Sequence, residues 1–177
     1  MPISVFDLFK IGVGPSSSHT VGPMQAAFKY VTSLREADLL DQVAHLNVHL
    51  YGSLSATGVG HATDHAIIMG LMGERPDTID PLIIGPSIVS LKESQLLELG
   101  CQKTIAFDWN RDIYFHEESL PHHPNAMRLV AFTHQGELLY ENIYYSVGGG
   151  FVVEQAQMDM PLEDFDEATI PYNFDTA

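Results

Sequence analysis

Apolar residues recur along the chain first at helical spacing and then at strand spacing. A capping box opens a short predicted helix at 4–10, and apolar positions three or four apart predict a second helix from about 23 to 37. Residues 43–51 alternate between apolar and polar side chains, which predicts a half-exposed strand with His45 and His49 on its solvated side.

The middle of the chain is predicted to be helical between loops. The segment 52–60, "GSLSATGVG", is expected to be a loop because it is rich in glycine and hydroxyl residues. A helix is expected to start in "HATDHAIIMGLMG", where small residues such as Gly70 indicate close packing on a neighbour. Another helix is expected within 81–99.

Strands dominate from Cys101 onward. Aromatic and β-branched residues favour strands in "KTIAFDW", "DIYFHEE" and a long hairpin that turns at 134–137. Because helices come first and strands follow, we predict an α+β fold, with helices packed on a mixed or antiparallel sheet. The acidic, proline-containing segment 156–177 is expected to be a linker or tail after a single domain at 1–155.

Composition narrows the location and the chemistry. The chain has 177 residues and no apolar run near the roughly 20 residues that span a bilayer. Its first residues do not form a secretory signal, so we expect a cytoplasmic protein. Cys101, expected to be a small core residue, is the one cysteine in the sequence, which excludes an internal disulfide and a cysteine-built metal cluster within this chain.

The net charge excludes two classes of partner. The formal charge is −15 at pH 7. A surface of that sign repels phosphate backbones and anionic lipids, so we expect neither nucleic-acid binding nor membrane binding.

The first candidate site is "GPSSSHTVGPM", where a Gly-Pro pair stands on each side of a run of hydroxyl residues. A capping role needs one or two of these hydroxyls and leaves His19 unexplained. A helix start lined with hydroxyls and amides also favours negative charge. The segment is therefore either an extended helix cap or a site for a small charged molecule.

The second candidate is "GVGHATDH", which again leads from glycines into a helix start. His61 and His65 have the i, i+4 spacing of two metal ligands, although a zinc-protease motif has glutamate where this chain has Ala62. Asp64 can simply favour the helix dipole. A histidine beside Thr63 and Asp64 also suits a group that holds an amino acid or moves a proton.

Two further motifs have ordinary structural explanations. "LPHHPNAM" places His123 and Asn125 on either side of a proline, which is typical of a surface turn and is equally compatible with a site. "YYSVGGGF" ends a strand in three glycines, which by itself predicts a β-bulge.

Taken in order, "SVFDLFKIG", "GPSSSHTVGPM", "GHATDHA", "HPNAM" and "YYSVGGGF" resemble the β region of the iron–sulfur-dependent bacterial L-serine dehydratases, from about residue 3 to 153. The resemblance implies conversion of L-serine to pyruvate and ammonia. It also implies a 4Fe–4S cluster that acts as a Lewis acid on the serine hydroxyl, with no pyridoxal phosphate. The fold implied is similar to the allosteric substrate-binding domain of some phosphoglycerate dehydrogenases.

The resemblance also assigns roles by residue. It implies that His61 and His19 are the catalytic candidates, with the choice of base between them left open. The implied substrate-binding residues are Ser16, Ser17, Ser18, Thr20, Thr63, Asp64, His123, Asn125, Ser146, Gly148, Gly149 and Gly150. No metal ligand is expected in this chain, and the cluster is expected on an iron–sulfur α domain of the same enzyme, which would be a homodimer.

Three hypotheses follow from these motifs. The leading one is the substrate-binding part of an L-serine dehydratase that is inactive without its cluster domain. The second is an autonomous regulatory module that binds an amino acid. The third is a mononuclear metallohydrolase that uses His61 and His65.

Overall fold

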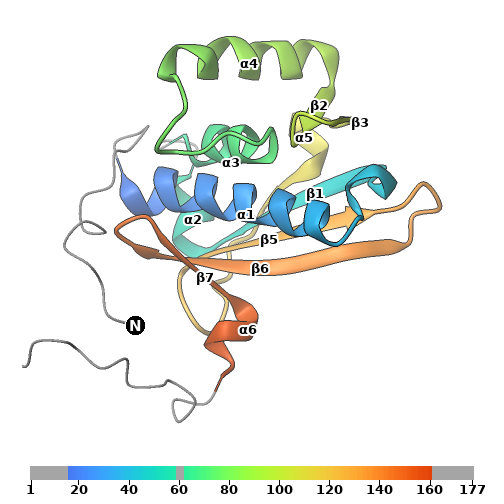
Figure 1. The fold of residues 1–177 in the computed structure, drawn as a ribbon. Coiled ribbons are helices and arrows are strands. Elements are labelled where there is room, and N and C mark those ends of the chain that lie inside the picture. Colours follow the sequence, from blue (N-terminus) through green and yellow to red (C-terminus); the bar gives the residue numbers. More distant parts are fainter. Residues whose placement is uncertain (1–15, 59–61, 161–177) are drawn as a thin grey trace, which may run out of the picture.

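The computed structural model of the chain describes residues 16–58 and 62–160 (Figure 1). The helices are α1 (Gly22–Glu36), α2 (Gly52–Thr57), α3 (Thr63–Leu71), α4 (Pro81–Ser94), α5 (Trp109–Asp112) and α6 (Gln155–Met158). The strands are β1 (His45–Tyr51), β2 (Leu96–Leu99), β3 (Lys103–Ala106), β4 (Ile113–Phe115), β5 (Asn125–Phe132), β6 (Leu138–Gly148) and β7 (Phe151–Glu154). The helix predicted at 4–10 lies outside the described residues.

A five-stranded mixed sheet is the base of the fold. Its order is β4-β1-β5-β6-β7, and β4 runs parallel to β1 while the other neighbours are antiparallel. The helices α1, α3 and α4 lie in successive layers above one face of this sheet, as Figure 1 shows. The α+β class and the mixed sheet predicted from the sequence are confirmed.

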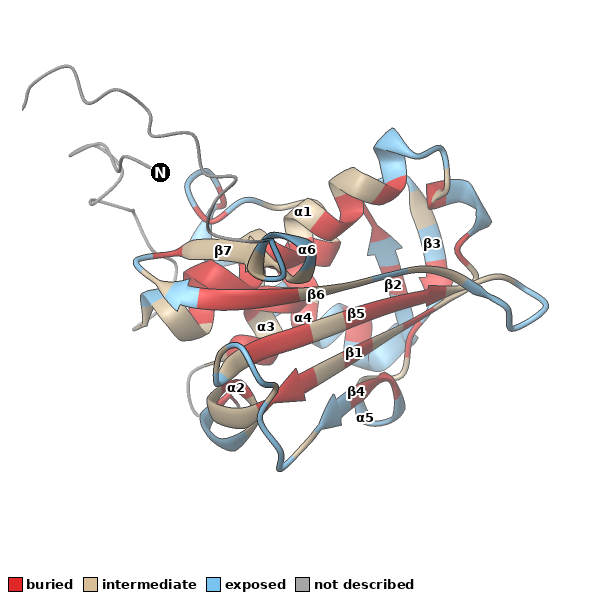
Figure 2. Ribbon diagram, turned by 90° about the horizontal axis from the view of Figure 1, so that it is seen from below, coloured by how far each residue is buried: buried red, intermediate tan, exposed pale blue. Residues whose placement is uncertain are grey.

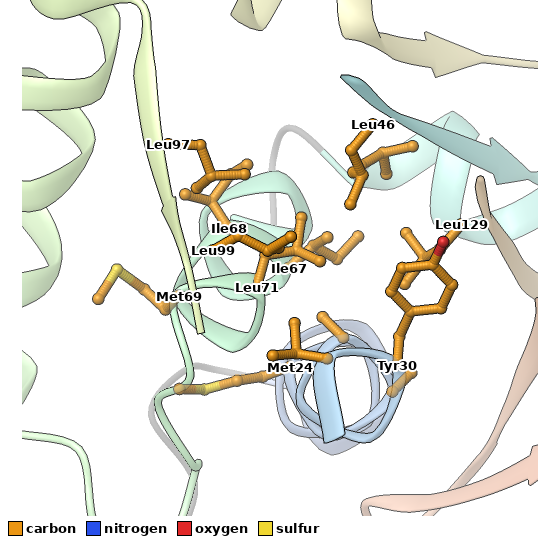
Figure 3. Close-up of a cluster of buried hydrophobic side chains, with 14 of the residues drawn as sticks. Met24, Tyr30, Leu46, Ile67, Ile68, Met69, Leu71, Leu97, Leu99 and Leu129 are labelled. Atoms are coloured by element: carbon orange, nitrogen blue, oxygen red, sulfur yellow. The ribbon is translucent and has the colours of Figure 1, made fainter. Parts of the chain in front are cut away.

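The hydrophobic core lies between the sheet and the helices. The alternation predicted for β1 is confirmed, because Leu46, Val48 and Leu50 are fully buried on the helix-covered face. In Figure 3, Leu46 and Leu129 of the sheet lie near Tyr30 of α1, with side chains of α3 beside them. Burial of such side chains contributes about 1.5–3 kcal/mol each, so this cluster is the main source of stability.

The helices α1 and α3 pack closely because of Gly70. A Cβ at Gly70 would lie 2.3 Å from the carbonyl oxygen of Met24 and 2.8 Å from the Cβ of Ala27. The close packing predicted for this helix from its small residues is therefore confirmed.

One local prediction was wrong for a reason of tertiary structure. Residues 52–57 form α2 and not a loop, because the first amides of this segment donate to carbonyls of the distant 118–124 loop. The helix expected within 81–99 is confirmed as α4, which the left-handed Gln95 (φ 55°) ends. Residues 96–99 then form β2, which pairs with β3 and was not predicted as a strand.

The prediction that Cys101 is a core residue was also wrong. Cys101 lies in the turn between β2 and β3 with φ 55°, and it is exposed. Its thiol lies 2.9 Å from the carbonyl oxygen of Met72, to which it donates a hydrogen bond.

Figure 2 shows the sheet face that is turned away from α1 and α3. His49 on this face is not simply solvated as predicted, because its Nδ1 lies 2.9 Å from Nε2 of His116 and its ring stacks on Tyr114. His45 is 44% exposed at its side chain and lies 3.4 Å from Asp112. None of the helices in the described ranges has the length and apolar character needed to cross a membrane.

Candidate functional site

The serine-rich segment forms a single π-helical turn, Ser17–Val21, that continues directly into α1. The amide of Gly22 donates to the carbonyl of Ser17, five residues back. Turns of this kind occur mostly as isolated insertions and often at functional sites. Ser16 caps the turn, since its hydroxyl accepts a hydrogen bond from the amide of His19 at 3.4 Å.

Two carbonyls of this turn receive their hydrogen bonds from other elements. In an α-helix the carbonyl of His19 would accept from residue 23, but Pro23 has no N–H, and the hydroxyl of Thr63 donates to it at 2.6 Å. The carbonyl of Ser18 accepts from the hydroxyl of Ser146 at 2.7 Å. Thr63 and Ser146 are both buried, so these bonds fix the turn against α3 and β6.

The imidazole of His19 lies between two hydroxyl groups. Its Nδ1 is 2.9 Å from Oγ of Ser18, and its Nε2 is 3.0 Å from Oγ of Ser53 at the start of α2. A neutral imidazole has one donor and one acceptor nitrogen, and a hydroxyl can partner either. Both tautomers of His19 are therefore compatible with this geometry.

The start of α2 is fixed by the loop that precedes β5. The amide of Ser53 donates to the carbonyl of Pro124 and that of Gly52 donates to the carbonyl of Glu118, both at 2.9 Å. Gly52 has φ 54°, and a Cβ there would lie 2.4 Å from the Pro124 oxygen. A residue other than glycine would therefore be strained and would push the loop away.

The same loop brings His123 and Asn125 to this end of the sheet. The amide of Asn125 donates to Nδ1 of His123 at 3.0 Å, and its side-chain amide donates to the carbonyl of Ser146 at 3.2 Å. Hydrogen bonds that involve side chains thus connect seven predicted site residues: Ser16, Ser18, His19, Thr63, His123, Asn125 and Ser146.

The other predicted residues have different positions. Ser17 is exposed, whereas Thr20 is buried and its amide donates to the Ser16 carbonyl. Asp64 is buried, and its carboxylate accepts from the amide of His65. His61 lies outside the described residues, so its predicted role stays a prediction.

The three glycines after Ser146 shape the chain rather than joining this network. Gly148, Gly149 and Gly150 all have positive φ values, 98°, 60° and 78°, and form the turn from β6 to β7. The register of the pair shifts between Ser146 and Gly148, which confirms the bulge predicted from the sequence.

Two residues of the site were not singled out from the sequence. Ser53 was placed in a supposed loop, although its position beside a glycine in a hydroxyl-rich segment was a usable signal. Gly22 is required because a Cβ there would lie 2.0 Å from Oγ of Ser146. No local sequence pattern indicates this contact, because the two residues are far apart along the chain.

The described residues do not provide a metal centre. Over 16–58 and 62–160, no group of three or more His, Cys, Asp or Glu side chains can hold a metal ion. His65, one of the two histidines in the metallohydrolase hypothesis, packs edge-on against Trp109. Since His61 is not described, that hypothesis stays open.

The comparisons with known proteins agree with the motifs. A model of the serine dehydratase beta chain matches residues 4–157. The chain is 45% identical over its whole length to an L-serine dehydratase of Streptomyces coelicolor and 42% identical over 99% of its length to one of Haemophilus influenzae. It is also 45% identical over 99% of its length to L-serine dehydratase 1 of Escherichia coli.

The chain spans 38–39% of the length of these three relatives. The family model nevertheless covers most of the chain, including all the residues of the hydrogen-bonded site. The chain therefore belongs to the serine dehydratase beta chain family.

Proposed function

We propose that this chain is the substrate-binding part of an L-serine dehydratase and that its site holds L-serine. One observation carries the proposal. The His19 imidazole is held between two hydroxyls at the start of a helix, at the end of the sheet where Asn125 and Ser146 also lie. The names of the relatives supply the substrate.

The proposed roles follow from the chemistry of L-serine. The hydroxyls and first amides of the segment from Ser16 to Ser18 suit its carboxylate, because a helix start favours negative charge. The side chains of Asn125 and His123 are proposed to line the opposite wall. A base removes the α-proton while the β-hydroxyl leaves as water, and the enamine product then hydrolyses to pyruvate and ammonia. His19 and His61 are the candidates for that base.

The described residues do not fit an iron–sulfur cluster. Such clusters use several cysteine thiolates, and Cys101 is the one cysteine of the sequence and bonds to the Met72 carbonyl. We therefore propose that any cluster is held by the remainder of the enzyme, and that the chain alone does not turn over L-serine.

Turnover by the complete enzyme tests the proposal. With His61→Ala, we expect the formation of pyruvate from L-serine to be lost while the iron content stays unchanged. Normal turnover by this variant would remove His61 from the mechanism. His65→Ala is the matched control, since His65 packs on Trp109 and not on the network of His19.

Ligand binding separates this function from a regulatory module. We expect L-serine, and not D-serine, to shift the NMR signals of Ser18, His19 and Asn125 in the isolated chain, with weak affinity. Tight binding of L-serine, together with normal turnover by site variants in the complete enzyme, would instead support an autonomous amino-acid sensor.

A further inference from the structure

We propose that Ser53 is a positioning residue that sets the orientation and tautomer of the His19 imidazole. This inference deepens the proposed function and rests on it for its catalytic consequence. The structural part rests on one contact, the 3.0 Å separation between Oγ of Ser53 and Nε2 of His19, across 34 residues of sequence.

The hydroxyl of Ser53 is not used to cap its own helix. Ser53 is the second residue of α2, and the residue before that helix makes no side-chain capping bond. The N-cap position, where a serine ordinarily bonds to amides of its own helix, is occupied by Tyr51. Here the hydroxyl points across to the π-helical turn, which indicates a role at His19.

The two hydroxyls that contact the ring differ in what they can fix. Ser18 precedes His19 in the same turn and moves with it, and its hydroxyl is also 3.3 Å from that of Ser16. Ser53 belongs to another element, so it alone of these two relates the ring to the rest of the site. Its contact fixes the position of Nε2 relative to the start of α2.

The backbone at Ser53 is held firmly enough for this role. Its amide donates to the Pro124 carbonyl, and the hydroxyl of Thr57 donates to its carbonyl at 2.9 Å. Gly52 directly before it lets the 118–124 loop approach closely, because a Cβ there would lie 2.4 Å from the Pro124 carbonyl oxygen. Ser53 therefore presents its hydroxyl from a fixed position, as groups that orient catalytic histidines do.

A hydroxyl also has a chemical advantage over a carboxylate at this position. A carboxylate only accepts hydrogen bonds, so it would hold the proton on Nε2. The Ser53 hydroxyl can donate to Nε2 or accept from it, which leaves His19 able to change tautomer when a proton moves. This property suits a ring that exchanges a proton with a substrate.

The first test uses NMR of this chain and does not depend on catalysis. The ring ¹⁵N shifts of His19, assigned with His19→Gln, are compared in the wild type, Ser53→Ala and Ser53→Thr. We expect Ser53→Ala to change the Nε2 shift and the tautomer ratio, and Ser53→Thr to restore them. Ser55→Ala, which removes a hydroxyl from the same helix, should leave them unchanged. Unchanged His19 signals in Ser53→Ala would overturn the proposal.

The second test measures kinetics in the complete enzyme. We expect Ser53→Ala to lower kcat by about 10- to 100-fold and to shift the pH profile, a smaller loss than the roughly 10²- to 10⁴-fold contribution of an acid–base group itself. We expect KM to change by less than about threefold, because a positioning residue affects proton transfer and not the binding of the substrate. A kcat loss that Ser53→Thr does not reverse, or that Ser55→Ala equals, would contradict the role.

The two tests separate the two proposals. If His19 responds to Ser53→Ala but the complete enzyme does not act on L-serine, the proposed function fails and the positioning role stands. If Ser53→Ala does not fold, Ser53→Cys replaces it, because sulfur keeps the shape of the side chain and is a weak hydrogen-bonding atom.

Discussion

Pro23 has no amide hydrogen, so the carbonyl of His19 cannot bond to residue 23 as it would in an α-helix. A hydroxyl distant in sequence bonds to this carbonyl instead. Thr63 supplies that hydroxyl from a fully buried position. A buried carbonyl that loses its partner costs about 1–3 kcal/mol, more than the hydrogen bond itself contributes. The link between the π-helical turn and α3 is therefore polar and specific.

Replacing Thr63 by valine tests this link. Thr63→Val keeps the shape and removes the hydroxyl, so we expect the free energy of unfolding to fall by about 1–3 kcal/mol. The control is Thr32→Val, whose hydroxyl bonds to the Phe28 carbonyl within one helix. Urea unfolding should show a change below about 0.5 kcal/mol for the control. Equal effects of the two substitutions would contradict this account.

His49, on the other face of the sheet, makes stability depend on pH. The pKa of His49 is lowered to about 4 by burial, by the charge of Arg128 and by His116. Glu118 lies 3.7 Å from the other nitrogen of His116, and Tyr114 and Tyr51 stack on the two imidazoles. His49 is therefore neutral in the folded protein at neutral pH.

The sign of the effect follows from proton uptake. In the unfolded chain His49 titrates near 6.5, so between about pH 6.5 and 4 the unfolded state binds more protons. Stability due to His49 is therefore complete above pH 6.5 and is lost as the pH falls toward 4. Since His49 is only half buried, we expect a loss of about 1–2 kcal/mol after allowance for solvent screening.

Denaturant unfolding between pH 4.5 and 7.5 measures this loss. His49→Phe should reduce the slope in that range, whereas His134→Gln in the β5–β6 turn should leave it as in the wild type. A wild-type slope in the His49→Phe variant would show that other groups cause the dependence.

At the scale of elements, the contact of α1 with α3 depends on one missing side chain. Gly70→Ala places a Cβ 2.3 Å from the Met24 carbonyl oxygen and forces the helices apart, so we expect a loss of about 2–4 kcal/mol. The control is Gly85→Ala in α4, where a Cβ would have no heavy atom within 4 Å. We expect the control to change stability by less than about 1 kcal/mol by urea unfolding. Similar losses in both variants would show that helix packing is not the cause.

The elements that the sequence predicted well are those in which side-chain pattern and local preference agree. The alternation in β1, the helix that became α1 and the β5–β6 hairpin each carry a clear period over many residues. The short helix α2 has no such period. Amides of its first turn donate to carbonyls about 70 residues further along the chain, and no local pattern predicts these bonds. The strand β2 was not predicted, because its four residues are too few to show a strand period.

The candidate site was predicted as a set of segments and not as a geometry. The motifs around His19, Thr63, Asn125 and Ser146 could be identified, because unusual residues at the ends of elements are visible in a sequence. The structure brings these motifs together. The role of Ser53 was not visible, because it depends on the position of one hydroxyl relative to a ring on another element. Which carbonyl accepts the hydroxyl of Ser146 was equally beyond a local pattern.

At the scale of the whole molecule, the large negative charge opposes folding. The 23 acidic residues outnumber the 8 basic ones, and like charges repel more strongly in the compact state. Raising NaCl from about 0.02 to 0.2 M shortens the Debye length from about 20 Å to about 7 Å, so we expect Tm to rise by a few degrees. The control is a neutral sugar, added to the same osmolarity as the NaCl, with Tm measured in the same way. A constant or falling Tm with salt would mean that the charges are already balanced locally.

The hydrogen bond from Ser146 to the carbonyl of Ser18 joins residues 128 positions apart. Closing so long a loop costs more chain entropy than forming a local turn, so we expect this bond to form late in folding. A nascent or partly unfolded chain consequently contains the residues of the site but does not yet hold them together. A ligand of the proposed site would then bind only the finished fold and stabilise it by RT ln(1 + [L]/Kd), so the free energy of unfolding would rise with the logarithm of ligand concentration.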